Sequence, residues 1–186
     1  MSRQDGNERL PNFRYHPDPV ATGSIEASSR TCDVCLQQRS FLYVGPVYTS
    51  RADEPSVCPW CIADGSAARH FDAQFTDVGP GLGEAPPEVV DEVLTRTPGF
   101  TGWQQEEWPG HCSDASVYVG PVGAAELAGL PNEAMEAFRL EAASWGGWAG
   151  PAVDDYLASL SREGMPTGYL FQCRHCDTYL GYSDFT

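Results

Sequence analysis

Residues 31–63 read TCDVCLQQRSFLYVGPVYTSRADEPSVCPWCIA and contain two Cys-x-x-Cys pairs, Cys32/Cys35 and Cys58/Cys61. The 22 residues between the pairs give the spacing of a four-thiolate zinc site. Four protein thiolates leave no open position for water, so we expect this site to be closed and structural. Redox-active thiols and an iron–sulfur cluster are the alternatives that the same spacing leaves open.

The residues between and after these pairs predict how the site is built. Residues 40–48 are rich in aromatic and β-branched side chains and are interrupted by Gly45-Pro46, which favours a bent strand or a hairpin. Pro59 suits the first turn of a short helix that begins after Cys58. The order is thus a knuckle (the tight turn that carries Cys32 and Cys35), a hairpin, and a helix whose first turn carries the second cysteine pair. This order predicts a treble-clef-like finger. A zinc ribbon, in which the second knuckle continues as a strand, is the alternative.

Three further cysteines, Cys112, Cys173 and Cys176, form a second set that is one ligand short of a tetrahedral site. The residues able to supply the fourth donor are His111, His175, His70, His16 and Asp114. We choose His111, although two adjacent residues can bind one ion only if the backbone between them is locally twisted. His175 lies inside its own knuckle, where the middle residues usually point away from the ion. The two sets together predict two zinc ions per chain.

The incomplete second set also defines how the protein would act as an enzyme. With only three protein ligands, water would take the fourth position and the site would resemble that of a zinc hydrolase. A Cys112 nucleophile with His111 as its base is less favoured, because neighbours on a strand face opposite ways and cannot readily hydrogen-bond. We therefore assign no catalytic residue.

The remainder of the chain indicates an α+β fold rather than regularly alternating strands and helices. Hydrophobic periodicity predicts helices over 88–94, 132–145 and 151–160. Strands are expected over 100–108 and 116–119.

Both ends of the chain carry recognisable signals. Residues 1–30 are polar and punctuated by proline, so we expect them to lie extended along the surface. Residues 168–182 predict a ribbon-like hairpin around the last Cys-x-x-Cys pair. We expect one domain over 1–186 with two sub-lobes joined by short helices. The sub-lobes are a first zinc finger over 11–78 and a second zinc lobe over 96–186, which has a helical insert over 123–165.

The charge of the chain is strongly negative. Its formal net charge is −15, and all 11 of its basic residues are arginine. Residues 70–138 contain only Arg96 as a base against 12 carboxylates: Asp72, Asp77, Glu84, Glu88, Asp91, Glu92, Glu106, Glu107, Asp114, Glu126, Glu133 and Glu136. Nucleic-acid binding is not expected without a clustered basic surface. An acidic field favours a basic protein partner, although such a surface also serves solubility alone.

The chain shows no signal for export or membrane insertion. Its first residues, MSRQDGNE, contain no apolar leader segment, and no stretch approaches 18 uninterrupted apolar residues. We therefore expect a cytoplasmic protein that does not associate with membranes. Cytoplasmic thiols stay reduced, so paired cysteines are expected to bind metal rather than to form disulfides.

Three segments resemble the CbrC family: CPWCIADGSAA at 58–68, RTPGF with GWQQE over 96–106, and GYLFQC at 168–173. The resemblance extends from about Pro11 to the C-terminus and includes the six paired cysteines. It implies a bacterial, cytoplasmic protein of about this size. It supplies no catalytic residues, and the family name is tied to colicin tolerance.

The main hypothesis from these observations is an interaction protein whose fold is stabilised by bound zinc. Such a protein would act as an immunity-like factor whose acidic 70–138 region binds a basic partner such as a toxin nuclease. The alternatives are a hydrolase-like metalloenzyme at Cys112, Cys173 and Cys176, and a stress-regulatory zinc protein whose effect on colicin tolerance is indirect.

Overall fold

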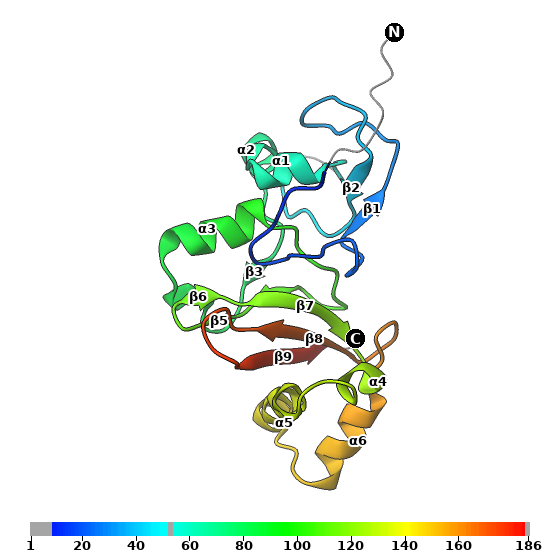
Figure 1. The fold of residues 1–186 in the computed structure, drawn as a ribbon, viewed down its shortest axis with the longest axis vertical. Coiled ribbons are helices and arrows are strands. Elements are labelled where there is room, and N and C mark those ends of the chain that lie inside the picture. Colours follow the sequence, from blue (N-terminus) through cyan, green and yellow to red (C-terminus); the bar gives the residue numbers. More distant parts are fainter. Residues whose placement is uncertain (1–8, 52–53, 185–186) are drawn as a thin grey trace. The chain divides into compact units, whose positions relative to one another are not determined.

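The computed structural model describes residues 9–51 and 54–184 and contains both helices and strands (Figure 1), which confirms the α+β prediction. The chain divides into two compact units. The first unit comprises the described residues of Met1–Thr76 together with Asp91–Phe100, and the second comprises those of Asp77–Val90 and Thr101–Thr186. The single domain over 1–186 with sub-lobes 11–78 and 96–186 stays a prediction.

Within its described residues, the first unit contains two short strands, two short helices and the end of a third helix. Strand β1 (Ile25–Ala27) pairs antiparallel with β2 (Phe41–Tyr43), so the Cys32/Cys35 knuckle lies between the two paired strands. Helix α1 (Pro59–Ala63) begins immediately after Cys58, as the position of Pro59 predicts. Helix α2 (Ser66–Phe71) follows Gly65, whose φ of 71° reverses the chain between the helices.

Of the two structures predicted for residues 40–48, the hairpin is not formed, and the chain instead bends after a short strand. The first half of this segment, β2, pairs with residues that precede the knuckle, whereas Tyr48 forms a bridge to Gln74. The chain bends because the Tyr43 ring lies against Gly45 and its hydroxyl donates to the Pro46 carbonyl at 2.9 Å. The treble-clef description therefore stays an interpretation of the element order.

The core of the first unit is built around its cysteines. Cys32, Cys58 and Cys61 are buried in one apolar cluster with Phe13, Ile25, Leu42, Val57, Ile62, Phe71 and Phe75. Phe13, Tyr15 and His16 are all buried, so the expected surface path of residues 1–30 is wrong for this segment. Its alternation of aromatic and polar residues allows it to lie extended while it packs into the core.

The buried His16 predicts a dependence of stability on pH. Its Nδ1–H donates to the Pro98 carbonyl at 2.7 Å, and its Nε2 accepts from the Thr22 hydroxyl at 2.6 Å. Burial lowers the pKa of His16 from 6.5 to about 4, so the folded protein holds this imidazole neutral. As the pH falls below 6.5, His16 becomes protonated in the unfolded chain, whereas in the folded chain it stays neutral down to about pH 4. The first unit should lose about 3 kcal/mol across this window.

Urea unfolding at several pH values between about 7 and 4.5 measures this loss. His16→Gln should show a flatter decline than the parent chain. Thiolate protonation lowers the stability of both chains, so the difference between them isolates His16. An identical decline in both chains would show that His16 makes no contribution.

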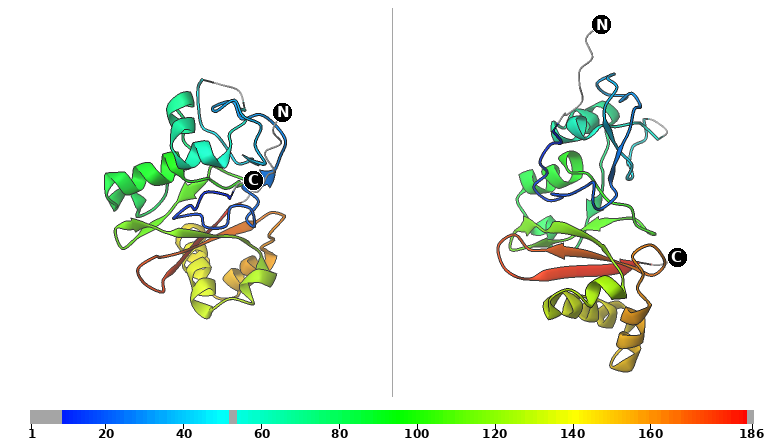
Figure 2. Two further views of the ribbon diagram at one scale, coloured as in Figure 1. Left: turned by 45° about the horizontal axis from the view of Figure 1, so that its top comes forward. Right: turned by 45° about the vertical axis from the view of Figure 1, so that its right-hand side comes forward.

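The second unit is organised by an antiparallel sheet of three strands in the order β7-β8-β9. The strands are β7 (Val117–Val122), β8 (Thr167–Gln172) and β9 (Tyr179–Asp184). Strands β8 and β9 form the predicted hairpin around Cys173 and Cys176. Helices α5 (Asn132–Gly146) and α6 (Pro151–Ser159) lie on one side of this sheet (Figure 2).

The shorter elements of this unit are β3 (Asp77–Val78), the 3-10 helix η1 (Leu82–Glu84), β4 (Glu107–Trp108), β5 (Gly110–His111), β6 (Asp114–Ala115) and α4 (Ala124–Leu127). Helix α3 (Pro87–Arg96) begins in the second unit and ends in the first. The predicted helices are confirmed by α3, α5 and α6, and the predicted strand over 116–119 is confirmed by β7. Of the strand predicted over 100–108, only β4 is formed, and residues 101–106 are a loop.

The sheet has two apolar faces, which follow the alternation of side chains along β8. On the helical face, the fully buried Phe138 of α5 lies against Gly168 and Gly181, where a Cβ atom would collide with its ring. On the other face, Phe171 packs edge-on against Trp108 with ring centroids 5.5 Å apart. No helix within residues 9–51 and 54–184 combines the length and apolar character needed to cross a membrane.

Candidate metal centres

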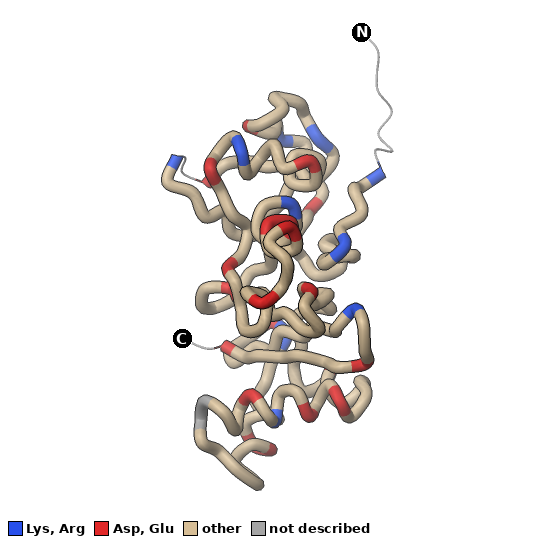
Figure 3. The backbone as a smooth tube through the Cα atoms, turned by 90° about the vertical axis from the view of Figure 1, so that its left-hand side faces the viewer, with Lys and Arg blue, Asp and Glu red and all other residues tan. Residues whose placement is uncertain are grey.

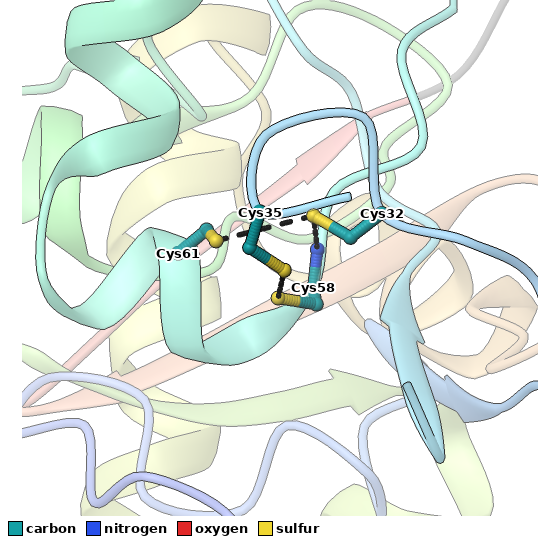
Figure 4. Close-up of side chains that lie close together, drawn as sticks. All are labelled: Cys32, Cys35, Cys58 and Cys61. Atoms are coloured by element: carbon teal, nitrogen blue, oxygen red, sulfur yellow. Dashed lines mark hydrogen bonds between the residues drawn. The ribbon is translucent and has the colours of Figure 1, made fainter. Parts of the chain in front are cut away.

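The first cluster consists of Cys32, Cys35, Cys58 and Cys61, and all four sulfurs lie within 4.8 Å of one another (Figure 4). The Sγ atoms of Cys32 and Cys61 are 3.9 Å apart, as are those of Cys35 and Cys58. Cys58 is the N-cap residue of α1, and Cys61 lies in its first turn, so the helix start fixes the second pair. This arrangement suits tetrahedral coordination of one ion.

The knuckle that carries the first pair is closed by backbone hydrogen bonds. The amide of Leu36 donates to the Cys32 carbonyl, and the amide of Cys32 donates to the Gln37 carbonyl, both at 2.9 Å. Leu36 has a φ of 57°, in the left-handed region, which turns the chain back towards β2. The knuckle thereby holds Cys32 and Cys35 on the same side of the turn.

The protonation of these thiols indicates what the cluster can hold. The Cys58 thiol donates to the Cys32 sulfur, which lowers the pKa of Cys32 to about 4 and raises that of Cys58 far above its usual range. Desolvation raises the pKa of Cys61 to about 11. Four thiolates therefore do not coexist in this core without a compensating cation. A divalent metal ion would supply that charge and replace the shared protons.

The second cluster consists of His111, Cys112, Cys173 and Cys176, whose ligand atoms also lie within 4.8 Å of one another. The Nδ1 atom of His111 lies 3.2 Å from the Cys112 sulfur and 3.5 Å from the Cys176 sulfur. The sulfurs of Cys112 and Cys176 are 3.9 Å apart. Cys112 and Cys176 are exposed, whereas Cys173 is buried, so this cluster is more open to solvent than the first.

A tight turn explains how adjacent residues reach the same point. His111 on β5 pairs with Asp114 on β6, which leaves Cys112 and Ser113 as a two-residue hairpin loop. Both loop residues are left-handed, with φ values of 53° and 56°, as in a type I′ turn. Cys112 therefore lies in the turn and not on the strand, so its side chain does not have to oppose that of His111. Left-handed non-glycine residues are strained, and such strain is typical of functional sites.

The other candidates for the fourth ligand lie elsewhere. His16 and His70 belong to the first unit, where His70 packs edge-on against Phe71. Asp114 accepts from Arg174 Nη1 at 2.7 Å and lies 2.8 Å from His175 Nε2, so these side chains engage one another. The backbone amide of His175 donates to the Cys173 sulfur at 3.4 Å.

The contact between His111 and Cys112 corrects one expectation. Because Cys112 lies in the turn, the two side chains do come within hydrogen-bond distance, contrary to the argument from strand geometry. The thiol is not activated, however: desolvation and the neighbouring Cys176 and Cys173 raise the pKa of Cys112 to about 11. Cys176 is the more acidic thiol, because its hydrogen bonds with Thr178 lower its pKa to about 6.

Comparisons with known proteins place the chain in a family. Residues 10–185 match the model of an uncharacterised protein family, UPF0167. UPF0167 proteins of Mycobacterium bovis and Mycobacterium tuberculosis are each 50% identical to the chain over 179 residues, which cover 96% of this chain and 95% of the relative. A UPF0167 protein of Pseudomonas aeruginosa is 42% identical over 184 residues, with 97% and 99% coverage. No solved structure matches the chain. The chain therefore belongs to the bacterial protein family UPF0167.

Proposed function

We propose that the protein binds two zinc ions and uses both to fix its structure. The ligand sets are four thiolates in the first cluster and three thiolates with one imidazole in the second, and both sets are typical of structural zinc. Soft thiolate ligands in tetrahedral arrangement exclude magnesium and calcium, which prefer oxygen. The element order around the first cluster, with a knuckle before paired sulfurs at a helix start, supports a treble-clef-like finger.

Replacing His111 by alanine is expected to weaken the binding of one zinc ion by roughly 100-fold or more, because three thiolates and water remain in place of a closed set. His175→Ala is the matched control, since it removes an imidazole of the same unit that faces Asp114. Competition with a chromophoric zinc chelator measures both affinities. Equal affinity of His111→Ala and the parent chain would exclude His111 as a ligand.

We infer that the zinc scaffold supports an interaction with a basic protein, and the distribution of charge carries this proposal. The second unit contains 15 Asp and Glu residues against three Arg, whereas the first contains 11 against eight. The negative charge is therefore concentrated in the second unit, which contains nine of the 12 carboxylates of the 70–138 stretch. Figure 3 marks the Arg, Asp and Glu residues that lie within 9–51 and 54–184 along the backbone. The resulting negative field speeds the encounter with a cationic partner and orients it.

The CbrC resemblance suggests a colicin nuclease as this basic partner, so that the protein would act as an immunity-like factor. Calorimetry of the zinc-loaded chain with a colicin nuclease domain tests the proposal at salt concentrations from about 50 to about 500 mM. The affinity is expected to fall steeply as salt screens the acidic unit. Affinity independent of salt, or no binding at low salt, would contradict the proposal.

Hydrolysis at the second cluster is the other candidate function, and the exposure of Cys112 and Cys176 favours it. An enzyme of this kind needs an exchangeable water on the metal. His111 as a fourth donor argues against such a water. Electronic spectra of the cobalt-substituted protein separate the two functions, because an added anion perturbs an open site and leaves a closed one unchanged.

A further inference from the structure

Trp103 in the second unit is held rigidly while its side chain remains open to solvent. The residue is 44% exposed. Its indole Nε1–H is nevertheless satisfied, because it donates to the Thr167 hydroxyl at 2.9 Å and to the Gly164 carbonyl at 3.1 Å. Its apolar surface is therefore available while its polar edge is not.

Two buried carboxylates fix the loop that carries this side chain. Asp184, only 5% exposed, accepts from the backbone amides of Trp103 and Gln104, both at 2.9 Å. Glu106, only 4% exposed, accepts from the Gly102 amide at 2.7 Å. A Cβ atom at Gly102 would lie 2.9 Å from Asp184 Oδ2, so only glycine allows this close approach. The loop is thus preorganised, which lowers the entropy cost of binding through it.

A folding role alone does not account for this arrangement. Buried carboxylates are costly unless they are fully hydrogen-bonded, and Asp184 Oδ1 is buried with no hydrogen-bond partner among the described residues. These carboxylates nevertheless order a loop whose tryptophan remains 44% exposed. Leu140 on α5 is 64% exposed, and its side chain has no polar group to fix its position.

The surroundings of Trp103 indicate what it binds. Met165, which is 49% exposed, follows directly after Gly164, whose carbonyl accepts from the indole. Tryptophan and methionine are enriched in protein interfaces, and tryptophan is among the commonest energetic hot spots. Glu163, two residues before Met165, is exposed, and so is Glu107, whose amide directly follows the loop and donates to the Tyr182 hydroxyl at 3.3 Å. Arg162 is exposed as well, so the acidic setting of Trp103 comes from the net charge of the second unit. A tryptophan face in an acidic setting favours a guanidinium or ammonium group.

We propose that Trp103 and Met165 form the docking site for a segment of a basic protein that carries arginine or lysine beside apolar side chains. This inference deepens the proposed interaction with a basic protein and rests on it. The cationic groups stack on Trp103 and are neutralised by the acidic unit, while the apolar groups contact Met165. Asp184 and Glu106 act as positioning residues, since they hold the loop and remain buried.

The test uses the zinc-loaded full chain and a capped peptide of alternating arginine and leucine. The indole Nε1–H signal of Trp103, assigned by its loss in Trp103→Phe, is followed by nuclear magnetic resonance during the titration. At low salt, this signal should shift as peptide is added and should reach a plateau at saturation. Trp103→Ala should weaken binding about tenfold or more, whereas Trp103→Phe keeps an aromatic face and should retain most of the affinity. Leu140→Ala is the matched control and should bind as the parent chain does.

Three outcomes would overturn the docking site: unchanged affinity of Trp103→Ala, equal binding of a peptide of alternating glutamate and leucine, or no shift of the indole signal. Zinc content and thermal stability of Trp103→Ala establish that the variant is folded. If Trp103→Ala binds the arginine peptide as tightly as the parent chain and with the same salt dependence, the docking site fails while the acidic-unit proposal stands. If binding in both chains is insensitive to salt, the acidic-unit proposal fails as well.

Discussion

Cys58→Ser is expected to release one of the two proposed zinc ions and to unfold the first unit. Cys58 is fully buried, caps α1 and shares the apolar cluster with Cys32 and Cys61. Structural zinc sites contribute an apparent free energy of roughly 10 kcal/mol or more, which is comparable to the whole stability of an average domain. The serine also leaves three thiolates crowded in the core without a closed metal site. Circular dichroism and hydrogen exchange measure the loss of structure, and mass spectrometry under native conditions measures the metal.

Cys176→Ser is the matched control for this substitution. Cys176 is exposed and lies at the turn between β8 and β9, so its loss should release the second ion while the sheet persists. The fully buried Phe138, Leu170 and Phe171 continue to stabilise that unit. If Cys58→Ser loses its zinc and yet melts at the temperature of the parent chain, the first cluster is not a structural site.

Phe138→Ala is expected to destabilise the second unit by about 3–5 kcal/mol. The ring is fully buried on the helical face of the sheet and fills the space above Gly168 and Gly181. Both glycines lack the atoms needed to fill the cavity that alanine would leave, and the backbone of a paired sheet cannot collapse into it. Urea unfolding monitored by the tryptophans near the sheet measures the change.

Leu140→Ala provides the comparison two residues further along the same helix. Leu140 is largely exposed, so its truncation should change the free energy of unfolding by less than about 0.5 kcal/mol. Zinc content should be unchanged in both variants, since neither residue belongs to a cluster. Similar effects of the two substitutions would show that α5 does not pack on the sheet as described.

The sequence predicts most of what depends on local spacing. Three features depend only on neighbours in the chain: cysteine pairs separated by two residues, Pro59 directly after Cys58, and the apolar period of α5. The structure forms the corresponding knuckles and helices. The hairpin around Cys173 and Cys176 is equally local and is confirmed. The partner of β2 is not predictable in this way, because Ile25–Ala27 has no signal that distinguishes it from residues 44–48 as a pairing strand.

In the candidate sites too, local features are predictable from the sequence and features that depend on distant contacts are not. His111 belongs with three cysteines only because Cys112 and Ser113 adopt left-handed backbone conformations, which non-glycine residues seldom signal in advance. His16 has the composition of a surface segment around it, and its burial depends on the distant Pro98 carbonyl. The strand predicted over 100–108 rests on Phe100, Trp103 and Trp108, yet within it the distant Asp184 accepts from the amides of Trp103 and Gln104. Contacts between residues far apart in the chain determine all three features.

The content and coordination of zinc in the full chain test the two-site proposal most directly. Elemental analysis is expected to give two zinc ions per chain. X-ray absorption at the zinc edge should give a total of seven sulfur ligands and one imidazole nitrogen for the two ions together. In His111→Ala the nitrogen signal should disappear while the sulfur signal of the first cluster persists. One ion per chain, or a parent chain whose second ion has oxygen in place of the imidazole nitrogen, would contradict the proposal of two closed structural sites.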